Sequence, residues 1–402
     1  MSNIDIQAYR DKMNRLAPTP EDMRIFWVGD DMARIEARTT YCLECIARGE
    51  GIVSALDDMA QIIGYEAPLV EDNEKDIIDA LMDNGAVLVK ATAEARGGRR
   101  ANDYSIWDRG YVVTTGRDPY EAYMALVVLE KAAEIQIKAA ALGGTEPLTK
   151  SHAKRERRRF LKKYSAPGRK RRTIEVESNS RNKYNKEDNN SEVSELAPEA
   201  ISDNASLLVS DLKGRMELVD YGNKLVEKDL VQGTWGNISV RLDEEYMLTT
   251  PSGLDYDDCK PEDMVRVNIE TLKAEDSLND PTSEKSIHAE IYKARPDVGA
   301  IVHTHSKYCS LLAACRMPLE VREESLAKDV GELILVADYG ESGSTTLAKN
   351  VVEALGERKG CIMSHHGMVA CGKDIEEALS IAMSMEEASR LLVNRKMDEM
   401  IK

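Results

Sequence analysis

The pattern of apolar and polar positions in the C-terminal half of the chain predicts alternating helices and strands. Residues 211–230 carry apolar side chains at near-helical spacing, which predicts a helix. Residues 238–242 alternate between apolar and polar positions, as a half-buried strand does. This alternation of element types predicts a layered α/β domain. Its further strands are predicted at 246–250, 299–305 and 360–364, and its further helices at 284–294 and 374–396.

A polar stretch separates this half from the N-terminal part. Residues 175–195 are almost all polar, so they cannot bury enough apolar surface to offset their own ordering entropy. The basic run from Lys150 to Arg172 holds twelve Lys or Arg and one Glu. We interpret this run as a solvated tether; contact with RNA or an acidic partner, and docking onto the acidic body of the protein, are the alternatives. The predicted domains are 1–148 and 206–402, joined by a basic and then polar flexible linker over 149–205.

Composition narrows the class of protein. With 402 residues, the chain is long enough for two cores, and 42% hydrophobic with 31% charged residues indicates a soluble globular protein. No stretch approaches the ~18 apolar residues of a membrane span, and the N-terminus lacks a signal-peptide core. Seven cysteines in a chain of this length do not suggest a disulfide framework, so a cytoplasmic location is predicted. A net charge of −17 argues against nucleic-acid binding as a general function.

An internal repeat links the two halves. Residues 116–133 match 372–389 in the places of Gly, Asp, Glu and Ala, and upstream 79–91 resembles 353–366. Chance similarity between amphipathic helices is the alternative, but the shared order of turn and helix favours duplication. The first domain is therefore interpreted as a shortened, diverged copy of the second.

Histidines carry the sharpest chemical signal. Five of the six lie in the C-terminal half. His303 and His305 are two residues apart on a predicted strand, so both side chains leave the same face. His365 and His366 follow another apolar strand, and one of them can point the same way. Three imidazoles with an open fourth position are typical of catalytic zinc, although two solvent-facing histidines on a strand are a common alternative.

Glu284 lies 19 residues before His303, at the start of a predicted helix. A carboxylate near a dication can transfer a substrate proton, or can bind the metal until substrate displaces it. The alternative is an ordinary first-turn Glu stabilised by the helix dipole. The residues alone leave both interpretations open.

Three small polar turns accompany these groups. Residues 281–283 place two hydroxyls and free backbone N–H groups at a predicted helix N-terminus, and residues 233–237 and 252–253 are two more small polar turns that contain glycine. Each alone is usually only a turn. Three of them near one metal indicate a phosphate site.

Four runs of sequence follow one another in the C-terminal half: QGTWGNISVR (232–241), TPSG (250–253), PTSEKSIHAEIYKARPDVGAIVHTH (281–305) and SHHGMVACG (364–372). These runs resemble the class II aldolase/adducin family, in particular its L-fuculose-phosphate aldolase branch. Their order and spacing make the resemblance specific over 212–396.

The resemblance implies the roles of the site residues. His303, His305 and His366 hold one Zn²⁺, with Glu284 as the catalytic acid/base and a further metal ligand. His365 is then a neighbour of the ligands and His288 a surface residue of its helix. The substrate phosphate is held by Thr234, Asn237, Ser252, Gly253, Thr282 and Ser283.

The implied activity is a zinc-dependent aldolase cleaving a ketose 1-phosphate, with L-fuculose 1-phosphate as the first candidate. The products are dihydroxyacetone phosphate and a small aldehyde such as lactaldehyde. A dehydratase of the methylthioribulose-1-phosphate type, a pentulose-5-phosphate 4-epimerase and a noncatalytic adducin-like interaction protein remain as alternatives. The resemblance also implies a homotetramer with sites between subunits.

Two departures from the family concern the aldehyde end of the site. Arg322 stands where the family has a tyrosine, and the chain ends at Lys402 without the family's tail and its further tyrosine. These differences leave the identity of the substrate open.

The first domain lacks the predicted chemistry. It contains no histidine, and Lys90 and Ala91 stand where His365 and His366 do in the second domain. Asp30 and Asp31 follow one of its candidate strands, and two carboxylates binding another ion are the alternative. We interpret it as a noncatalytic copy used for packing, oligomerisation or partner binding, with an exposed loop at 93–109.

Overall fold

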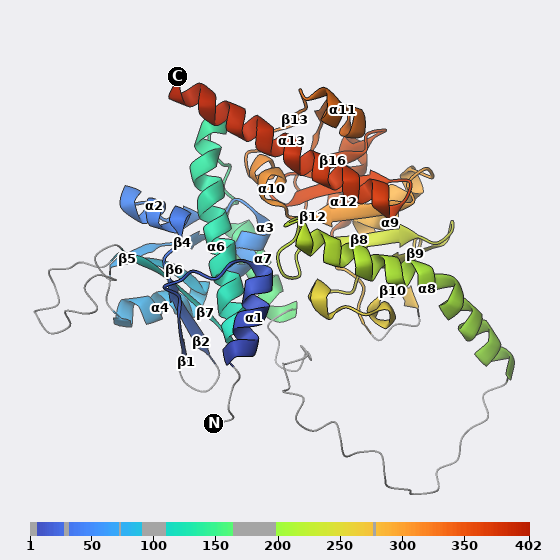
Figure 1. Ribbon diagram of the computed structural model, residues 1–402, viewed down its shortest axis with the longest axis horizontal. Helices are drawn as coiled ribbons and strands as arrows, with labels where there is room; N and C mark the ends of the chain where they lie inside the picture. Colours follow the sequence, from blue (N-terminus) through green and yellow to red (C-terminus); the bar gives the residue numbers. More distant parts are fainter. Residues whose placement is uncertain (1–5, 28–31, 72–73, 91–109, 164–197, 276–278) are drawn as a thin grey trace, which may run out of the picture.

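A computed structural model describes residues 6–27, 32–71, 74–90, 110–163, 198–275 and 279–402 (Figure 1). Within these ranges the strands form one main sheet in each half of the chain and two further pairs of short strands. The mixed α/β architecture predicted for 206–402 is confirmed. None of the helices in the described ranges is both long and apolar enough to span a membrane.

The N-terminal half contains a five-stranded sheet in the order β1-β2-β7-β6-β5, with α4 on one face and α2 and α6 on the other. The strands of this half are β1 (Arg24–Trp27), β2 (Ala33–Ala37), β3 (Ile52–Val53), β4 (Glu66–Ala67), β5 (Leu69–Glu71), β6 (Ala86–Lys90) and β7 (Tyr111–Gly116), of which β3 and β4 form a separate pair. Its helices are α1 (Ile6–Leu16), α2 (Thr40–Arg48), α3 (Asp57–Ile63), α4 (Glu74–Asn84), α6 (Pro119–Ala139), η1 (Ala140–Leu142) and α7 (Lys150–Lys163).

The C-terminal half contains an eight-stranded sheet in the order β11-β10-β9-β8-β12-β17-β16-β15. The strands of this half are β8 (Asn237–Arg241), β9 (Tyr246–Thr249), β10 (Val265–Asn268), β11 (Ala274–Glu275), β12 (Ala300–Thr304), β13 (Leu319–Glu320), β14 (Leu333–Ile334), β15 (Val336–Ala337), β16 (Gly360–Met363) and β17 (Gly367–Gly372), of which β13 and β14 form a separate pair. Its helices are α8 (Pro198–Glu227), η2 (Tyr256–Asp258), η3 (Pro261–Asp263), α9 (Lys285–Ala294), α10 (Lys307–Ala314), α11 (Glu324–Val330), α12 (Thr345–Leu355) and α13 (Ile375–Ile401).

Strand β12 lies in the middle of this sheet and separates two layers of helices. Ile301 packs with Ile287 of α9 and Leu347 of α12, whereas Val302 belongs to the core that contains α10 and α13. Successive side chains of a strand point to opposite faces. His303 therefore leaves β12 on the α9 side of the sheet.

Helix α6 joins the two halves. It packs on β7 of its own sheet and contacts α10 of the C-terminal half, and Figure 1 shows it between the two sheets. Leu129 of α6 and Leu312 of α10 belong to one continuous cluster of buried residues. The halves therefore share a hydrophobic core rather than meeting at a polar contact.

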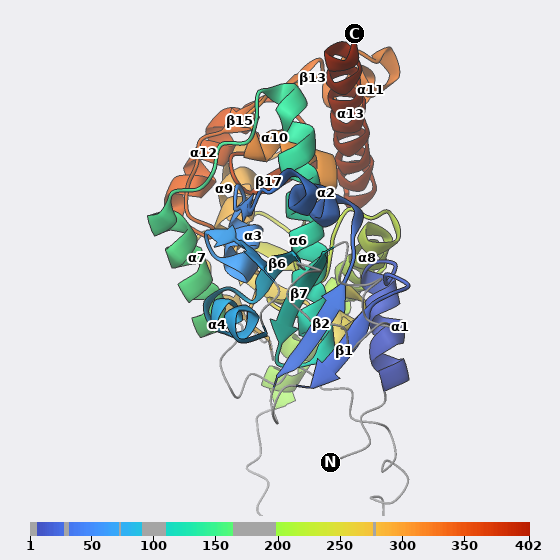
Figure 2. The same cartoon turned by 90° about the vertical axis from the view of Figure 1, so that its left-hand side faces the viewer.

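The basic segment interpreted above as a tether is a docked helix over 150–163. Figure 2 shows α7 beside α3, and its residues Ala153 and Glu156 are buried. Arg155 forms an ion pair of 2.8 Å with Glu341 of the C-terminal half. The flexible-linker prediction is thus wrong for this helix, because its buried side packs against α3 and its Arg155 pairs with Glu341.

The rest of the predicted linker is described only in part. Residues 198–205 belong to α8, which begins earlier than the helix predicted at 211–230. The polar stretch 175–195, the predicted loop 93–109, and Asp30, Asp31 and Ala91 lie outside the described residues.

Candidate metal centre and phosphate site

The C-terminal end of β12 and the turn between β16 and β17 bring the three predicted histidine ligands together. His303 stands opposite Asn237 of β8 and Val369 of β17 in the sheet. His366 lies in the turn that precedes β17. His365, before it, has a φ of 60°, a left-handed conformation that is costly for a residue other than glycine.

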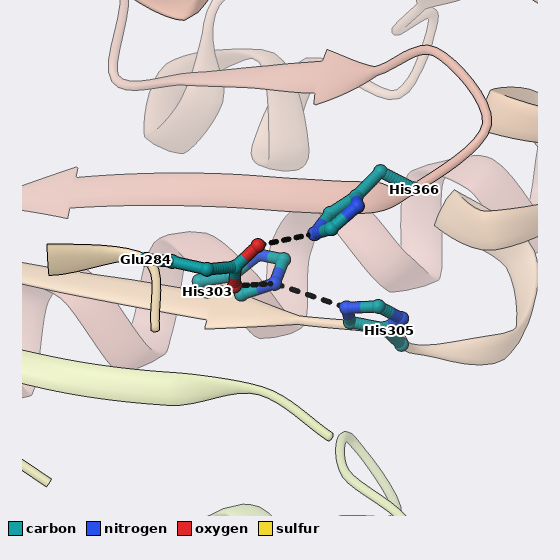
Figure 3. A group of neighbouring side chains, drawn as sticks. All are labelled: Glu284, His303, His305 and His366. Atoms are coloured by element: carbon teal, nitrogen blue, oxygen red, sulfur yellow. Dashed lines mark hydrogen bonds and ion pairs between the residues drawn. The ribbon is translucent and has the colours of Figure 1, made fainter. Parts of the chain in front are cut away.

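Glu284 completes the cluster from a different element, since it immediately precedes α9. One side-chain atom from each of Glu284, His303, His305 and His366 lies within 4.8 Å of the other three, and all four residues are buried (Figure 3). Glu284 Oε2 is 3.0 Å from His303 Nε2, and its Oε1 is 2.7 Å from His366 Nε2. The Nε2 atoms of His303 and His305 are 3.0 Å apart. Three nitrogens and one oxygen therefore converge.

The partners of the other ring nitrogens indicate which atom of each imidazole carries the proton. His303 Nδ1 lies 2.8 Å from the Met368 carbonyl oxygen, and His305 Nδ1 lies 3.3 Å from Asp58 Oδ2. Both partners accept hydrogen bonds, so each Nδ1 donates its proton and each neutral Nε2 keeps a lone pair. Two lone pairs facing each other at 3.0 Å repel unless a cation lies between them.

His366 has an acceptor at the same ring position, because its Nδ1 faces Asp57 Oδ2 at 3.2 Å. Its buried Nε2 lies 2.7 Å from Glu284 Oε1, as an ion pair does. In a tetrahedral zinc site with Zn–N distances of ~2.0 Å, ligand nitrogens lie about 3.3 Å apart. The donor set and its spacing therefore fit a divalent metal.

Burial and neighbouring charges shift the pKa values of the groups in this cluster. Burial opposes ionisation of Glu284, but His366 and His303 outweigh it and hold the carboxyl pKa well below its usual range. Burial lowers the pKa of His305 to about 4. These two shifts favour the ligand forms, an ionised carboxylate and a neutral imidazole. His366 differs, because burial lowers its pKa but the Glu284 and Asp57 carboxylates outweigh burial and hold that pKa well above its usual value. A metal at Nε2 would therefore take the place of that proton.

Two of the predicted phosphate turns lie side by side next to Glu284. The backbone N–H of Thr282 donates to the Thr250 carbonyl (3.1 Å), and that of Ser252 donates to the Asp280 carbonyl (2.9 Å). Thr282 Oγ1 also accepts a hydrogen bond of 3.3 Å from the Glu284 N–H. The turns that carry Ser252, Gly253, Thr282 and Ser283 are thus joined to each other and to the carboxylate.

The third turn, which carries Thr234 and Asn237, runs against the end of β12. A Cβ on Gly236 would stand 2.8 Å from the His303 carbonyl oxygen, so glycine permits this approach. Asn237 Nδ2 donates to Glu284 Oε2 (2.9 Å). The three turns therefore lie against one another, against Glu284 or against the end of β12.

Comparison with known proteins now places the chain. The model of the family described as class II aldolase and adducin N-terminal domain matches residues 216–393. The 5-methylthioribulose-1-phosphate/5-deoxyribulose-1-phosphate aldolase of Rhodospirillum rubrum is 35% identical over 173 residues, which cover 43% of this chain and 77% of that protein. The chain belongs to the class II aldolase and adducin family.

Other relatives in this aldolase and adducin family match the same half of the chain. The 5-deoxy-D-ribulose 1-phosphate aldolase of Bacillus thuringiensis is 32% identical, with 46% of this chain and 86% of that protein covered. The L-fuculose phosphate aldolase of Haemophilus influenzae is 33% identical, with 42% and 77% covered. A solved structure of an L-fuculose 1-phosphate aldolase has 32% identity and a TM-score of 0.44, with 46% of this chain and 86% of that chain covered.

One prediction inside the aldolase domain is wrong. His288 is not on the surface of its helix but completely buried. Its Nε2 lies 2.5 Å from Asn237 Oδ1 and its Nδ1 2.7 Å from Ser239 Oγ. His288 therefore holds the side chain of Asn237 in the orientation in which Asn237 donates to Glu284.

Sequence reasoning also misses residues that contact the aldolase site from elsewhere. Ser342 Oγ donates to Glu284 Oε1 (3.1 Å), while Asp57 and Asp58 approach the histidines from the N-terminal half. No spacing motif connects these residues with the histidine runs. Only the tertiary packing shows them.

Proposed function

We propose that this chain is a zinc-dependent class II aldolase that cleaves a ketose 1-phosphate to dihydroxyacetone phosphate and a small aldehyde. The observation that carries the proposal is the convergence of three imidazole Nε2 atoms and the Glu284 carboxylate beside three polar turns. His303, His305 and His366 hold the metal, and Glu284 is its fourth ligand before substrate binds. Bound zinc supplies Lewis-acid stabilisation of the negative charge that develops on the substrate oxygens during C–C cleavage.

Glu284 is the acid/base of this proposal. Its two oxygens accept hydrogen bonds from Asn237 Nδ2 and Ser342 Oγ, which fix the carboxylate plane. A carboxylate held in this way can accept a proton from a substrate hydroxyl and return it to carbon. Such a role contributes on the order of 10²–10⁴ in rate.

The phosphate is held by the three turns. Thr234, Asn237, Ser252, Gly253, Thr282 and Ser283 lie in these turns, four of them with hydroxyl side chains, and 281–283 precede the N-terminus of α9. A helix N-terminus favours a dianion through its free N–H groups and its dipole. A phosphate here would place carbon atoms of the same substrate next to the metal cluster.

Two substrates are supported most directly. L-fuculose 1-phosphate is our first candidate, and 5-deoxyribulose 1-phosphate is the second, because two of the relatives are named for it. Both carry the same ketose 1-phosphate end and differ at the aldehyde end. Arg322, where the resembling enzymes have a tyrosine, is the residue whose chemistry would choose between them.

We further propose that residues 1–148 are a degenerate copy of the catalytic domain. The strands β1-β2-β7-β6-β5 pair in the same senses as β8-β12-β17-β16-β15, with three antiparallel pairs followed by one parallel pair. A long helix follows β7 in one half and β17 in the other. Each of these helices begins with an aspartate cap, Asp118 or Asp374.

A shared capping contact supports the same proposal. Glu130 of α6 accepts hydrogen bonds from the backbone N–H groups of Tyr41 and Cys42 at the start of α2. Glu386 of α13 does the same for Tyr308 and Cys309 of α10. Aligning these contacts places Glu36 and Arg38 where His303 and His305 stand, so the copy lacks the metal ligands.

The homotetramer and the cytoplasmic location are further parts of this proposal, and both rest on the resemblance. Light scattering coupled to size-exclusion chromatography tests the assembly.

The activity is tested by measuring dihydroxyacetone phosphate release from a panel of ketose 1-phosphates by the zinc-loaded protein. We expect release from L-fuculose 1-phosphate or 5-deoxyribulose 1-phosphate, and its loss in His366→Ala. Glu290→Gln, on the partly exposed side of α9, serves as the control that keeps activity. No release from any member of the panel would reject the aldolase and direct attention to dehydratase and epimerase assays.

A further inference from the structure

Each of the three candidate histidine ligands has its Nδ1 next to an acceptor, and two of these acceptors come from the N-terminal half. Asp57 Oδ2 is 3.2 Å from His366 Nδ1, and Asp58 Oδ2 is 3.3 Å from His305 Nδ1. Both aspartates are in the first turn of α3 and are at most 1% exposed. Two consecutive residues of one helix therefore reach two different ligands of a site that the other half builds.

We propose that Asp57 and Asp58 are positioning residues of the metal centre, so that the N-terminal half supplies the outer carboxylates of the catalytic half. The inference rests on the metal site of the proposed function. It gives the noncatalytic half a chemical role beyond packing.

The physical reason lies in the two ends of the imidazole ring. A carboxylate that accepts the Nδ1 proton fixes the tautomer and the ring orientation, and it makes the opposite Nε2 a stronger donor to a metal. For His303 the acceptor of the Nδ1 proton is the Met368 carbonyl oxygen within the same sheet. For His305 and His366 the acceptors are the two aspartates of α3.

The aspartates are themselves held in place. Lys131 of α6 lies 3.3 Å from Asp58 Oδ2, and its Nζ donates to the His305 carbonyl oxygen (2.6 Å). The Asp57 N–H donates to the His365 carbonyl oxygen (2.9 Å), and His365 Nδ1 lies 3.0 Å from the Ala55 carbonyl oxygen. The start of α3 is thus clamped to the histidine turn through backbone atoms as well as side chains.

The buried charged groups that contact the histidine ligands also favour a cation. Glu284, Asp57 and Asp58 contribute three negative charges and Lys131 one positive charge, and all four are at most 5% exposed. Burying two unbalanced charges is costly unless a counter-charge accompanies them. A divalent metal at the convergence of the Nε2 atoms supplies that counter-charge, and without metal a proton on His366, which contacts both Glu284 and Asp57, supplies part of it.

The alternative role for the aspartates is structural, because ion pairs across the shared core could merely hold the halves together. The two roles differ in one measurable respect. A structural pair changes the stability of the fold, whereas a positioning pair changes the affinity of the folded protein for metal.

The test is a competition titration of zinc between the full-length protein and a chromophoric chelator, for wild type, Asp57→Asn and Asp58→Asn. We expect each substitution to weaken zinc binding by about 10–100-fold, the usual effect of removing an outer-shell partner. Replacing zinc with Co²⁺ gives a second readout, because its visible absorption reports the ligand geometry. We expect that spectrum to change in both variants.

The matched control is Glu130→Gln in the same half. Glu130 accepts hydrogen bonds from the start of α2 rather than from a candidate metal ligand, so this variant should lose stability and keep wild-type zinc affinity. Asp57→Glu retains the charge and should bind zinc more tightly than Asp57→Asn. If Asp57→Asn does not fold, Asp58→Asn and Asp57→Glu still decide the question.

Zinc affinities within about twofold of wild type in folded Asp57→Asn and Asp58→Asn would overturn the inference and leave the aldolase proposal intact, since the expected loss is about tenfold or more. Weakened zinc binding in a protein that cleaves no ketose 1-phosphate would support the inference and reject the aldolase. A wild-type protein that binds no zinc would reject both.

Discussion

The carboxylate of Glu284 is held by groups from four separate parts of the chain. His303 comes from β12, His366 from the turn before β17, Asn237 from β8 and Ser342 from the segment before α12. Such a residue is fixed in position before substrate arrives. Its role in catalysis can therefore be separated from its role in folding by a substitution that preserves shape.

We expect Glu284→Gln to lower the rate of dihydroxyacetone phosphate release by about 10²–10⁴, because the amide cannot accept and return a proton. Zinc should still bind, since the three imidazoles remain. Turnover and zinc content measured on the same preparation check both statements. A variant that retains full turnover would exclude Glu284 as the acid/base, while the Glu290→Gln control should match wild type.

His288 predicts a pH dependence of stability. Burial lowers its pKa to about 3, whereas in the unfolded chain the value is about 6.5. The unfolded state therefore binds one more proton between these values, and stability falls as the pH drops through this window, with a slope of at most about 1.4 kcal/mol per pH unit. Urea unfolding at several pH values from neutral to mildly acidic gives the free energy of unfolding as a function of pH. This free energy should fall less steeply with pH in His288→Gln than in wild type. Equal slopes would contradict the buried, neutral state of His288.

At the scale of elements, the site depends on how closely β12 and β17 approach. Gly367 begins β17, and a Cβ there would stand 2.4 Å from the Thr304 carbonyl oxygen and 3.3 Å from His305 Cδ2. The contact involves backbone, so the strands would have to separate to admit a side chain. Glycine at this position therefore sets the distance between His305 and His366.

We expect Gly367→Ala to lose about 1–3 kcal/mol of unfolding free energy, as overpacking in a core does, and to bind zinc more weakly. Gly116→Ala is the matched control, because its Cβ would stand 2.4 Å from a backbone nitrogen of α6 and its nearest contacts all belong to that helix. That control should lose stability without losing zinc affinity. Undiminished zinc binding by Gly367→Ala would show that the turn adjusts without moving His366.

The element scale also shows how far sequence reasoning reaches. The period-two pattern predicts β8 and a buried apolar run predicts β12, and the four runs that resemble the aldolase family are enough to bring the three histidines and Glu284 into one site. The docking of helix α7 is not predicted, because its charge suggests solvation. Its few buried side chains and its partner Glu341 are evident only in three dimensions. His288 is misplaced for the same reason, since the polar groups that satisfy a buried imidazole lie on a strand distant in sequence. Asp57, Asp58 and Ser342 carry no spacing signal at all.

At the scale of the whole molecule, the two halves share a core and a polar junction. The apolar part joins α6 to α10, and the polar part joins the start of α3 to the histidine turn. A ligand bound at such a junction stabilises both sides of it. By mass action the gain is about 4 kcal/mol at a free ligand concentration of about 1,000 times Kd.

We therefore expect chelation of the metal to loosen α3 as well as β12. Hydrogen exchange with and without EDTA should show lost protection of backbone amides at 57–63 and at 300–304, while β1 and β2 keep theirs. Loss confined to the C-terminal half would contradict an energetic link through Asp57 and Asp58.

The aspartates of α3 also bear on how damage to the N-terminal half would show itself. A variant whose outer carboxylate is lost needs about ten to a hundred times more free zinc for the same occupancy. Such a lesion would be conditional: severe when zinc is scarce and silent when zinc is abundant. A substitution in the half that supplies no metal ligand would thus make zinc occupancy depend on the zinc supply, and added zinc rather than refolding would restore it.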